Sequence, residues 1–281
     1  MRIRISHETT FNYAPATRSV IQNIRLTPRS FDSQYVLRWR VSVDLDGAVR
    51  HGEDSLGNVV HAFTYHKAVE RFTVSAIGEI ETTDAIGVVR GAVEPLLLPM
   101  YLRASPAAHV NNKLRELVAD AVEGSADSLD KLHRVMKALH DGVKCDPEAP
   151  LAQGGGTEEL ALGRAAPADI AHLFVAAARS LEIPARLVTG YVAPEDGEPI
   201  SGMDVWAEAY SPGLGWIAFD AVRDLCANDR YVRVAVGFDF ASAQPFRTTH
   251  SGAGVETIET AIKIQDLTAQ GPGQGQSQTI S

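Results

Sequence analysis

The spacing of hydrophobic residues changes near residue 105 of this 281-residue chain. Over residues 37–45 apolar and polar side chains alternate, and another alternating run begins at Phe72. Such alternation is typical of strands with one face against a core and the other in water. Beyond residue 105 the apolar residues recur at helical spacing instead. The chain is therefore predicted to contain two regions that are built differently.

The first region is predicted to be an antiparallel, sandwich-like β domain over residues 1–88. Its short alternating runs are separated by turn residues, among them Asp46–Gly47 and Leu56–Asn58. Glycine, asparagine and aspartate favour turns because they tolerate backbone conformations that other residues avoid. Several short strands joined by such turns indicate an antiparallel sheet or a sandwich.

The second region is predicted to span residues 89–266 and to combine helices with strands. The pattern predicts helices after Ser105, from Leu129 to Leu139, and from Pro167 to the stop at Pro184. Strands are expected over 185–192, 203–210, 216–222, 231–240 and 255–265. Helices followed by a run of strands indicate the α+β class. The Gly- and Gln-rich residues 267–281 are expected to form a disordered tail.

Composition excludes several classes of function. The net charge is -9 and the pI about 5.5, which argues against general nucleic-acid binding. Two cysteines, Cys145 and Cys226, do not provide a disulfide framework, and no His or Cys spacing is typical of zinc. No signal peptide or membrane-spanning segment is recognised, and no cofactor motif. We expect a cytoplasmic protein without membrane contact, metal or cofactor.

Four stretches of the second region resemble the bacterial transglutaminase-like family. They are Gly163–Arg164, Asp169–Tyr191, Trp206–Asp220 and Tyr231–Phe240. The resemblance implies a papain-like or transglutaminase-like α+β core. The first region resembles the β-rich domain that accompanies this core, through its strand pattern and its turn at Asp54–Asn58.

The resemblance also implies a Cys-His-Asp triad, of which one member remains. The family's nucleophilic Cys lies two residues before the matched Asp169, and this chain has Pro167 there. The family's base His lies two residues before the matched Trp206, and this chain has Asp204. The third position is Asp220, as in the family. The resemblance thus implies the scaffold of a thiol enzyme, whereas the matched positions lack its nucleophile and its base.

The first hypothesis is a pseudoenzyme that binds a peptide or protein partner. Trp206 would then be a wall of the binding groove or part of the hairpin core. His172 is interpreted as a residue of the core or of a layer behind the site. Asp169 lies in the first turn of its helix, where an acid stabilises the positive end of the helix dipole. The resemblance suggests an ATP-grasp protein or an α-helical companion as partner.

The second hypothesis is a hydrolase or transferase that uses Asp204 and Asp220. If Tyr210 pairs with Trp216, these aspartates become diagonal neighbours roughly 7–8 Å apart. Two close carboxylates raise the pKa of one of them or recruit a cation, which suggests an acid/base pair or a metal site. In a third hypothesis the nucleophile has moved to Cys226, with His172 or another histidine as base.

Overall fold

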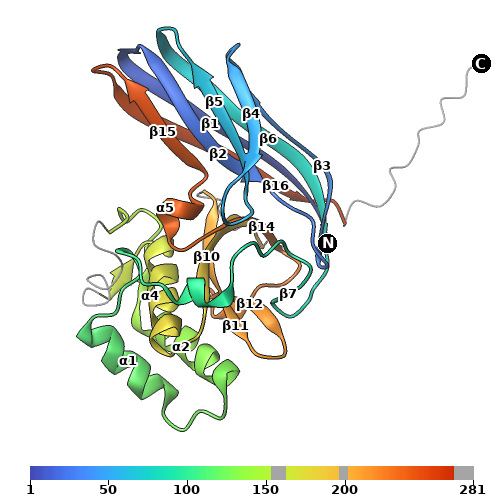
Figure 1. Ribbon diagram of the computed structural model, residues 1–281. Helices are drawn as coiled ribbons and strands as arrows, with labels where there is room; N and C mark the ends of the chain where they lie inside the picture. The colour runs from blue at the N-terminus through green and yellow to red at the C-terminus, as the bar shows by residue number, and fades with distance from the viewer. Residues whose placement is uncertain (153–162, 196–201, 269–281) are drawn as a thin grey trace, which may run out of the picture.

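The computed structural model describes residues 1–152, 163–195 and 202–268. Within these residues the strands form two four-stranded sheets, one six-stranded sheet and a short two-stranded pair. The fold is mainly β, with its long helices gathered in the lower part of the view (Figure 1). The expected α+β class describes only the helical region, because strands dominate elsewhere. The tail was predicted over residues 267–281, and all of it after residue 268 lies outside the described part of the chain.

The upper part of the molecule is an antiparallel β-sandwich, as the alternating pattern predicted (Figure 1). One sheet contains β1 (Arg2–Thr17), β3 (Gln34–Val43), β6 (Val69–Thr82) and β16 (Val255–Asp266). The other contains β2 (Ser19–Thr27), β4 (Ala48–Glu53), β5 (Val59–Tyr65) and β15 (Phe246–Ser251). Phe11, Phe63 and Phe72 lie in the apolar core between the sheets. Burial of these large rings is a main source of the sandwich's stability.

Strand β3 departs from simple alternation at one residue. Its pairing with β6 shifts between Val36 and Arg38, so that Leu37 has no paired partner in the register. The side chain of Leu37 is exposed, whereas Trp39 packs against the sandwich core. A β-bulge inserts one extra residue and turns it away from the buried face. The alternation predicted over residues 37–45 therefore fails at its first residue, because Leu37 does not face the core.

The last two strands return to the sandwich. Strand β15 pairs with β2, and β16 pairs with β1 over almost its whole length. Strand pairing thus corrects the expected boundary, because residues 246–266 complete the first region rather than the second. Local periodicity predicts that a strand forms there but carries no information about its partner.

The six-stranded sheet lies below the sandwich. Its order is β13-β12-β11-β10-β14, with β7 also paired to β12. The strands are β7 (Val88–Val89), β10 (Ala185–Val192), β11 (Asp204–Ser211), β12 (Gly215–Asp220), β13 (Leu225–Cys226) and β14 (Tyr231–Gly237). The two-stranded pair is β8 (Lys144–Cys145) with β9 (Arg164–Ala165).

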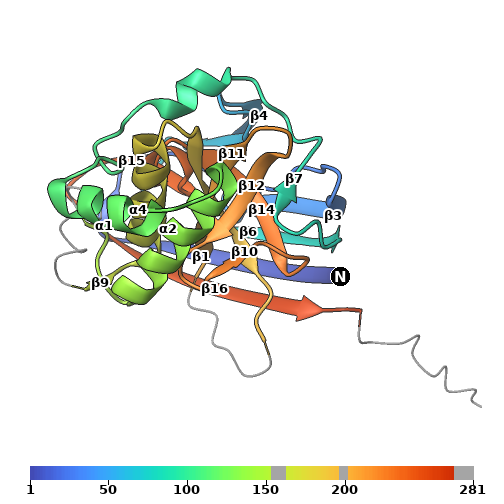
Figure 2. The same ribbon diagram turned by 90° about the horizontal axis from the view of Figure 1, so that it is seen from below.

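Helices cover one face of this sheet (Figure 2). They are α1 (Asn112–Val122), α2 (Ser128–Gly142) and α4 (Pro167–Ser180), with a short α5 (Phe240–Ala243) and a 3₁₀ turn η1 (Leu98–Leu102) elsewhere. Helix α1 begins later than expected, because Asn111 caps it by accepting from the Leu114 amide at 2.8 Å.

Helix α4 is the central helix of the lower part. It packs between the sheet and the other two long helices, and nearly all of its residues are buried. Pro167 occupies its first turn, where a missing backbone N–H costs nothing. The many alanines of this helix allow a close approach to β10 and β11, which fixes its N-terminus at one end of the sheet.

A turn of the sandwich docks on the opposite face of the sheet. The Asn58 side chain donates to the Val236 carbonyl and accepts from the Val236 amide, both at 2.8 Å. Asp54 holds this turn by accepting from the amides of Leu56 and Asn58 at 3.0 Å. These buried bonds join the sandwich to β14 and set the walls of the space between them.

Candidate functional site

The position expected for a nucleophile lies at the start of α4. Ala166 precedes the helix and makes no side-chain capping bond, and Pro167 is the first helical residue. Proline has no nucleophilic group and no backbone N–H with which to stabilise an oxyanion. The helix dipole that would favour a thiolate at this point therefore acts on an unreactive side chain.

The hairpin of β11 and β12 has the register that the sequence suggested. Tyr210 is paired with Trp216, and Ala207 with Phe219. Asp204 lies at the first residue of β11 and Asp220 at the last residue of β12. The hairpin therefore brings both aspartates to the same end of the sheet.

An arginine that the sequence analysis missed joins the two aspartates. Arg223 Nη2 lies 2.7 Å from Asp204 Oδ1, and Arg223 Nη1 lies 2.9 Å from Asp220 Oδ2. One guanidinium therefore neutralises one carboxylate and bridges to the next. The available signal was the position of Arg223 three residues beyond Asp220, in the turn after β12. Arg223 is not at one of the three triad positions, so the family resemblance did not indicate it.

Asp220 is fully committed to structural bonds. It is 1% exposed, and its Oδ1 accepts from the amides of Val222 and Arg223 at 2.9 and 3.2 Å. Its Oδ2 also accepts from the Tyr231 hydroxyl at 2.7 Å. Burial and the neighbouring Asp220 carboxylate raise the pKa of Tyr231, which keeps this hydroxyl protonated as a donor.

Asp204 is the less buried member of the pair. Its Oδ2 accepts from the Val192 amide at 3.1 Å, and its side chain is 20% exposed. Burial raises the pKa of the Asp204 carboxyl above its ordinary value, while Arg223 opposes that rise. The Asp220 charge adds to the rise but is a smaller cause than burial. Electrostatic repulsion, which the sequence analysis emphasised, is thus secondary to desolvation.

Comparison with known protein families accounts for this layout. Residues 115–221 match the transglutaminase-like superfamily, and residues 3–81 match the bacterial transglutaminase-like N-terminal region. The chain belongs to the transglutaminase-like superfamily. The two matched regions correspond to the helical part and to the sandwich, and the resemblance drawn from the sequence is confirmed.

Individual relatives of this transglutaminase-like chain extend along most of its length. An uncharacterised protein of Mycobacterium leprae is 27% identical over 288 residues, covering 95% of this chain and 99% of the relative. One of Mycobacterium tuberculosis is 22% identical and covers 88% and 86%. The crystal structure of a candidate cysteine protease from Cytophaga hutchinsonii has a TM-score of 0.76 at 20% identity, covering 95% and 91%. At this level of sequence identity, the similarity to the Cytophaga hutchinsonii structure shows a shared fold.

His172 and Asp169 lie inside the transglutaminase-like core, away from solvent. Both are buried in α4, and His172 Nδ1 lies 3.7 Å from Asp169 Oδ1. His172 Nε2 accepts from the Phe240 amide at 2.9 Å, and Asp169 Oδ2 accepts from the Ala152 amide at 3.0 Å. The two side chains thus tie α4 to α5 and to the chain before the helix.

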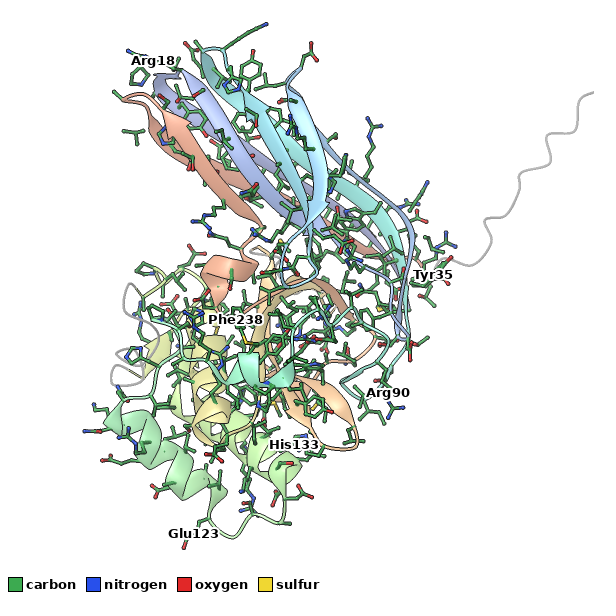
Figure 3. The ribbon with its side chains drawn as sticks, in the orientation of Figure 1. Arg18, Tyr35, Arg90, Glu123, His133 and Phe238 are labelled. Atoms are coloured by element: carbon green, nitrogen blue, oxygen red, sulfur yellow. The ribbon has the colours of Figure 1, made fainter. Side chains whose placement is uncertain are left out.

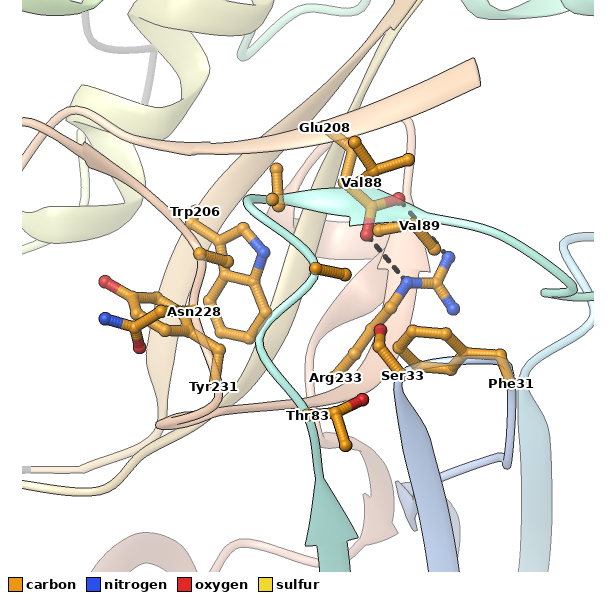
Figure 4. Close-up of a pocket in the computed structure, with 14 residues that line it drawn as sticks. Phe31, Ser33, Thr83, Val88, Val89, Trp206, Glu208, Asn228, Tyr231 and Arg233 are labelled. Atoms are coloured by element: carbon orange, nitrogen blue, oxygen red, sulfur yellow. Dashed lines mark hydrogen bonds and ion pairs between the residues drawn. The ribbon is translucent and has the colours of Figure 1, made fainter. Parts of the chain in front are cut away.

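Trp206 and Trp216 both lie in the sheet's apolar face opposite the helices. Trp206 packs edge-on against Tyr231, and Trp216 lies beneath the Arg186 guanidinium at 3.9 Å from its ring centre. Both indoles belong to the hairpin core. Trp206 also lines a cleft on this face, and Pro167, Asp204 and Asp220 are not among the residues that line it (Figure 4).

A buried ionic network extends along the same face. Arg186 donates to Glu94 at 2.6 Å and to Glu208 at 2.6 Å, and Arg233 donates to Glu208 at 2.7 Å. Burial disfavours charge on Glu208, but the two arginines prevail and hold its pKa below the ordinary value. A buried charge is tolerated only with such partners.

The two cysteines have surroundings that disfavour the thiolate. Burial raises the pKa of Cys226 to about 11, and Cys226 Sγ lies 3.4 Å from His133 Nε2. Burial and then the Asp220 charge raise the pKa of Cys145. The histidine beside Cys226 is thus His133 of α2, whereas His172 is bonded to α5.

Two further observations bear on cofactors and membranes. Among the described residues, no group of three or more His, Cys, Asp and Glu side chains could hold a metal ion. None of the described helices is long and apolar enough to cross a membrane.

Proposed function

We propose that this chain is a transglutaminase-like protein that has given up thiol acyl transfer and acts by binding a peptide or protein partner. The observation that carries the proposal is the bridge from Arg223 to Asp204 and Asp220. An arginine in this position occupies the carboxylate that would orient a catalytic imidazole. Pro167 and Asp204 at the other two triad positions support the same conclusion.

The local environment also favours binding over a relocated thiol. A nucleophilic cysteine needs a lowered pKa, whereas the pKa values of Cys145 and Cys226 are raised. Both cysteines are free, which fits a reducing compartment such as the cytoplasm. The proposal therefore assigns neither thiol a catalytic role.

Acid/base catalysis by Asp204 and Asp220 is the alternative. Such a pair needs two carboxyl groups with separate roles and a proton to exchange. Here Arg223 bonds to both carboxylates, and the Asp220 oxygens accept four hydrogen bonds in all. A carboxylate held in this way positions the turn after β12 and is poorly suited to proton transfer.

An acyl-transfer assay tests the loss of thiol chemistry. The purified chain would be incubated with a glutamine-containing peptide and hydroxylamine, and hydroxamate would be measured with and without iodoacetamide. We expect no product above the buffer control. Product that disappears after alkylation of either cysteine would contradict the proposal.

A binding experiment tests the second half of the proposal. An ATP-grasp protein and an α-helical protein, the partners that the family resemblance suggests, would each be purified from the same organism and titrated into the chain by calorimetry. We expect a saturable complex with one of them, and the same affinity for Cys226→Ser, since the thiol has no role. If neither protein binds, these two partners are excluded, and only the proposed loss of acyl transfer remains supported.

A further inference from the structure

A cleft runs between the sandwich and the sheet face opposite the helices (Figure 4). Its inner part has about 390 Å³ of empty space and its outer part about 610 Å³, and both volumes include space open to solvent. The two parts share the lining residues Ser33, Thr83, Ala85 and Val88. The two parts therefore adjoin each other along these four residues.

The inner wall presents hydrogen-bond donors. Trp206 is 2% exposed, and its indole Nε1 has no partner among the described residues. Figure 4 shows this nitrogen on the edge of the ring nearer to Glu208 and Val88. Within the described part of the chain, no acceptor is found for Asn228 Nδ2 or Arg233 Nη1 either. Of these donors only the Trp206 nitrogen is buried, and a buried donor without an acceptor is costly, so the site favours a ligand that supplies one.

The acceptors of the same wall are already used. Both Glu208 oxygens accept from Arg233, at 2.7 and 3.3 Å, and Arg186 adds a third bond at 2.6 Å. Asn228 Oδ1 accepts from the Arg230 amide at 3.0 Å. The free hydrogen-bonding capacity of the inner cleft thus belongs to donors, with the hydroxyls of Ser33 and Thr83 beside them.

The charge and shape of the cleft restrict the chemical class of ligand that it can hold. Each arginine of the inner network is matched by a glutamate, so the wall is close to neutral, and the only charged donor with a nitrogen left unbonded among the described residues that line the inner part is Arg233. The exposed Arg90 stands at the outer cleft, on the side of the molecule away from α1 (Figure 3). Phe31, Val88 and Val89 make the remaining walls apolar. Mostly apolar walls with a few convergent donors are typical of sites for small organic ligands.

We propose that this cleft binds a carboxylate group, carried by a small organic acid or by the C-terminus of a peptide. The carboxylate would accept from the Trp206 indole and from the Arg233 guanidinium, since two oxygens can serve two donors. The aliphatic part of the ligand would lie against Val88 and Val89. The inference uses residues outside the degenerate triad and does not depend on the loss of acyl transfer.

Titration followed by NMR tests this assignment in the whole chain. The three indole N–H signals are resolved by ¹⁵N labelling, and the Trp206 signal is assigned with Trp206→Phe. The probes are N-acetyl-alanyl-alanine with a free C-terminus, its C-terminal amide, and sodium propionate. We expect the free acid to shift the Trp206 signal saturably and the amide to bind roughly 10-fold more weakly, because it lacks the charge-assisted bond.

Three variants locate the binding site. Ala85→Phe fills the junction of the two parts and should abolish the saturable shift. Arg233→Gln should weaken binding roughly 10-fold through loss of its charge, and Ala85→Phe decides the question if Arg233→Gln does not fold. Thr257→Val, an exposed strand threonine on β16, is the control and should bind as the parent chain does.

The outcomes separate the two sources of the carboxylate. Propionate that binds as tightly as the peptide supports a small organic acid, and a clear preference for the peptide supports a peptide C-terminus. The assignment is overturned if no probe shifts the Trp206 signal, if the amide binds as tightly as the acid, or if the saturable shift survives Ala85→Phe. None of these results depends on the hydroxamate assay, so the two proposals fail separately.

Discussion

The Arg223 guanidinium lies 2.7 Å from the Asp204 carboxylate, at the position where the family resemblance expects a catalytic histidine. The same guanidinium reaches the third triad position, Asp220, at 2.9 Å. In the proposed function, this cation holds the two carboxylates in place as part of the fold. The predictions below follow from this bridge and from the burial around it.

Removal of the bridging cation should destabilise the fold. Arg223→Gln would leave Asp204 and Asp220 without their shared partner, and we expect a loss of about 1–2 kcal/mol in the free energy of unfolding at neutral pH. This is below the value for a fully buried pair because the Arg223 side chain is 36% exposed. Urea denaturation measures the loss.

Matched variants make that loss specific. Arg134→Gln removes an exposed ion pair with Asp130 and an exposed bond to the Glu123 carbonyl, and it should change stability by less than about 1 kcal/mol. The double variant Arg223→Gln with Asp204→Asn should recover part of the loss, because only one carboxylate remains. Full additivity of the two changes would contradict a shared electrostatic site.

Stability should depend on pH through Asp204. Its pKa is raised in the folded chain, so the folded state binds a proton more tightly than the unfolded state. This contribution to stability is present at low pH and is lost as pH rises from the ordinary value near ~4 through the raised pKa. Asp204→Asn should remove this decline, as measured by urea denaturation between acid and neutral pH. An unchanged pH profile in the variant would contradict the assignment.

The sequence predicted local structure better than long-range contacts. The start of α4 at Pro167 and the pairing of Tyr210 with Trp216 were confirmed, because proline chemistry and a short hairpin turn are local constraints. The partners of β15 and β16 could not be predicted, since strand pairing across the chain depends on tertiary packing. Arg223 was missed for a related reason, because its two partners meet only after the hairpin forms.

The cysteines should react slowly with alkylating agents. Burial raises the pKa of Cys226 to about 11, so its thiolate fraction at neutral pH should be at least ~100-fold below that of a free thiol. Iodoacetamide labelling at several pH values, followed by mass spectrometry, measures this reactivity. His133→Ala should leave the labelling rate within about twofold if the imidazole does not activate the thiol. Fast labelling at pH 7 that depends on His133 would support a relocated nucleophile.

Restoring the triad should require removal of Arg223 as well. In Pro167→Cys with Asp204→His, Arg223 still donates to Asp220, so the new imidazole lacks its carboxylate partner. Adding Arg223→Asn frees that carboxylate, and we expect hydroxamate formation only in the triple variant. A matched triple variant carries Pro167→Ser in place of the cysteine. It should form no hydroxamate that iodoacetamide can suppress. Equal activity of the double and triple variants would show that Arg223 does not block the site.

The most direct test of the bridge is an NMR titration of the Asp204 and Asp220 carboxyl carbons in the parent chain and in Arg223→Gln. The account predicts an Asp204 pKa above its ordinary value in the parent chain, because burial outweighs the cation. It predicts a further rise in Arg223→Gln, because the opposing charge is gone. Added Mg²⁺ or Zn²⁺ should leave the parent titration unchanged. The account would be contradicted if Asp204 titrated near ~4 in both proteins, or if a divalent cation displaced Arg223 and shifted both carboxyl signals.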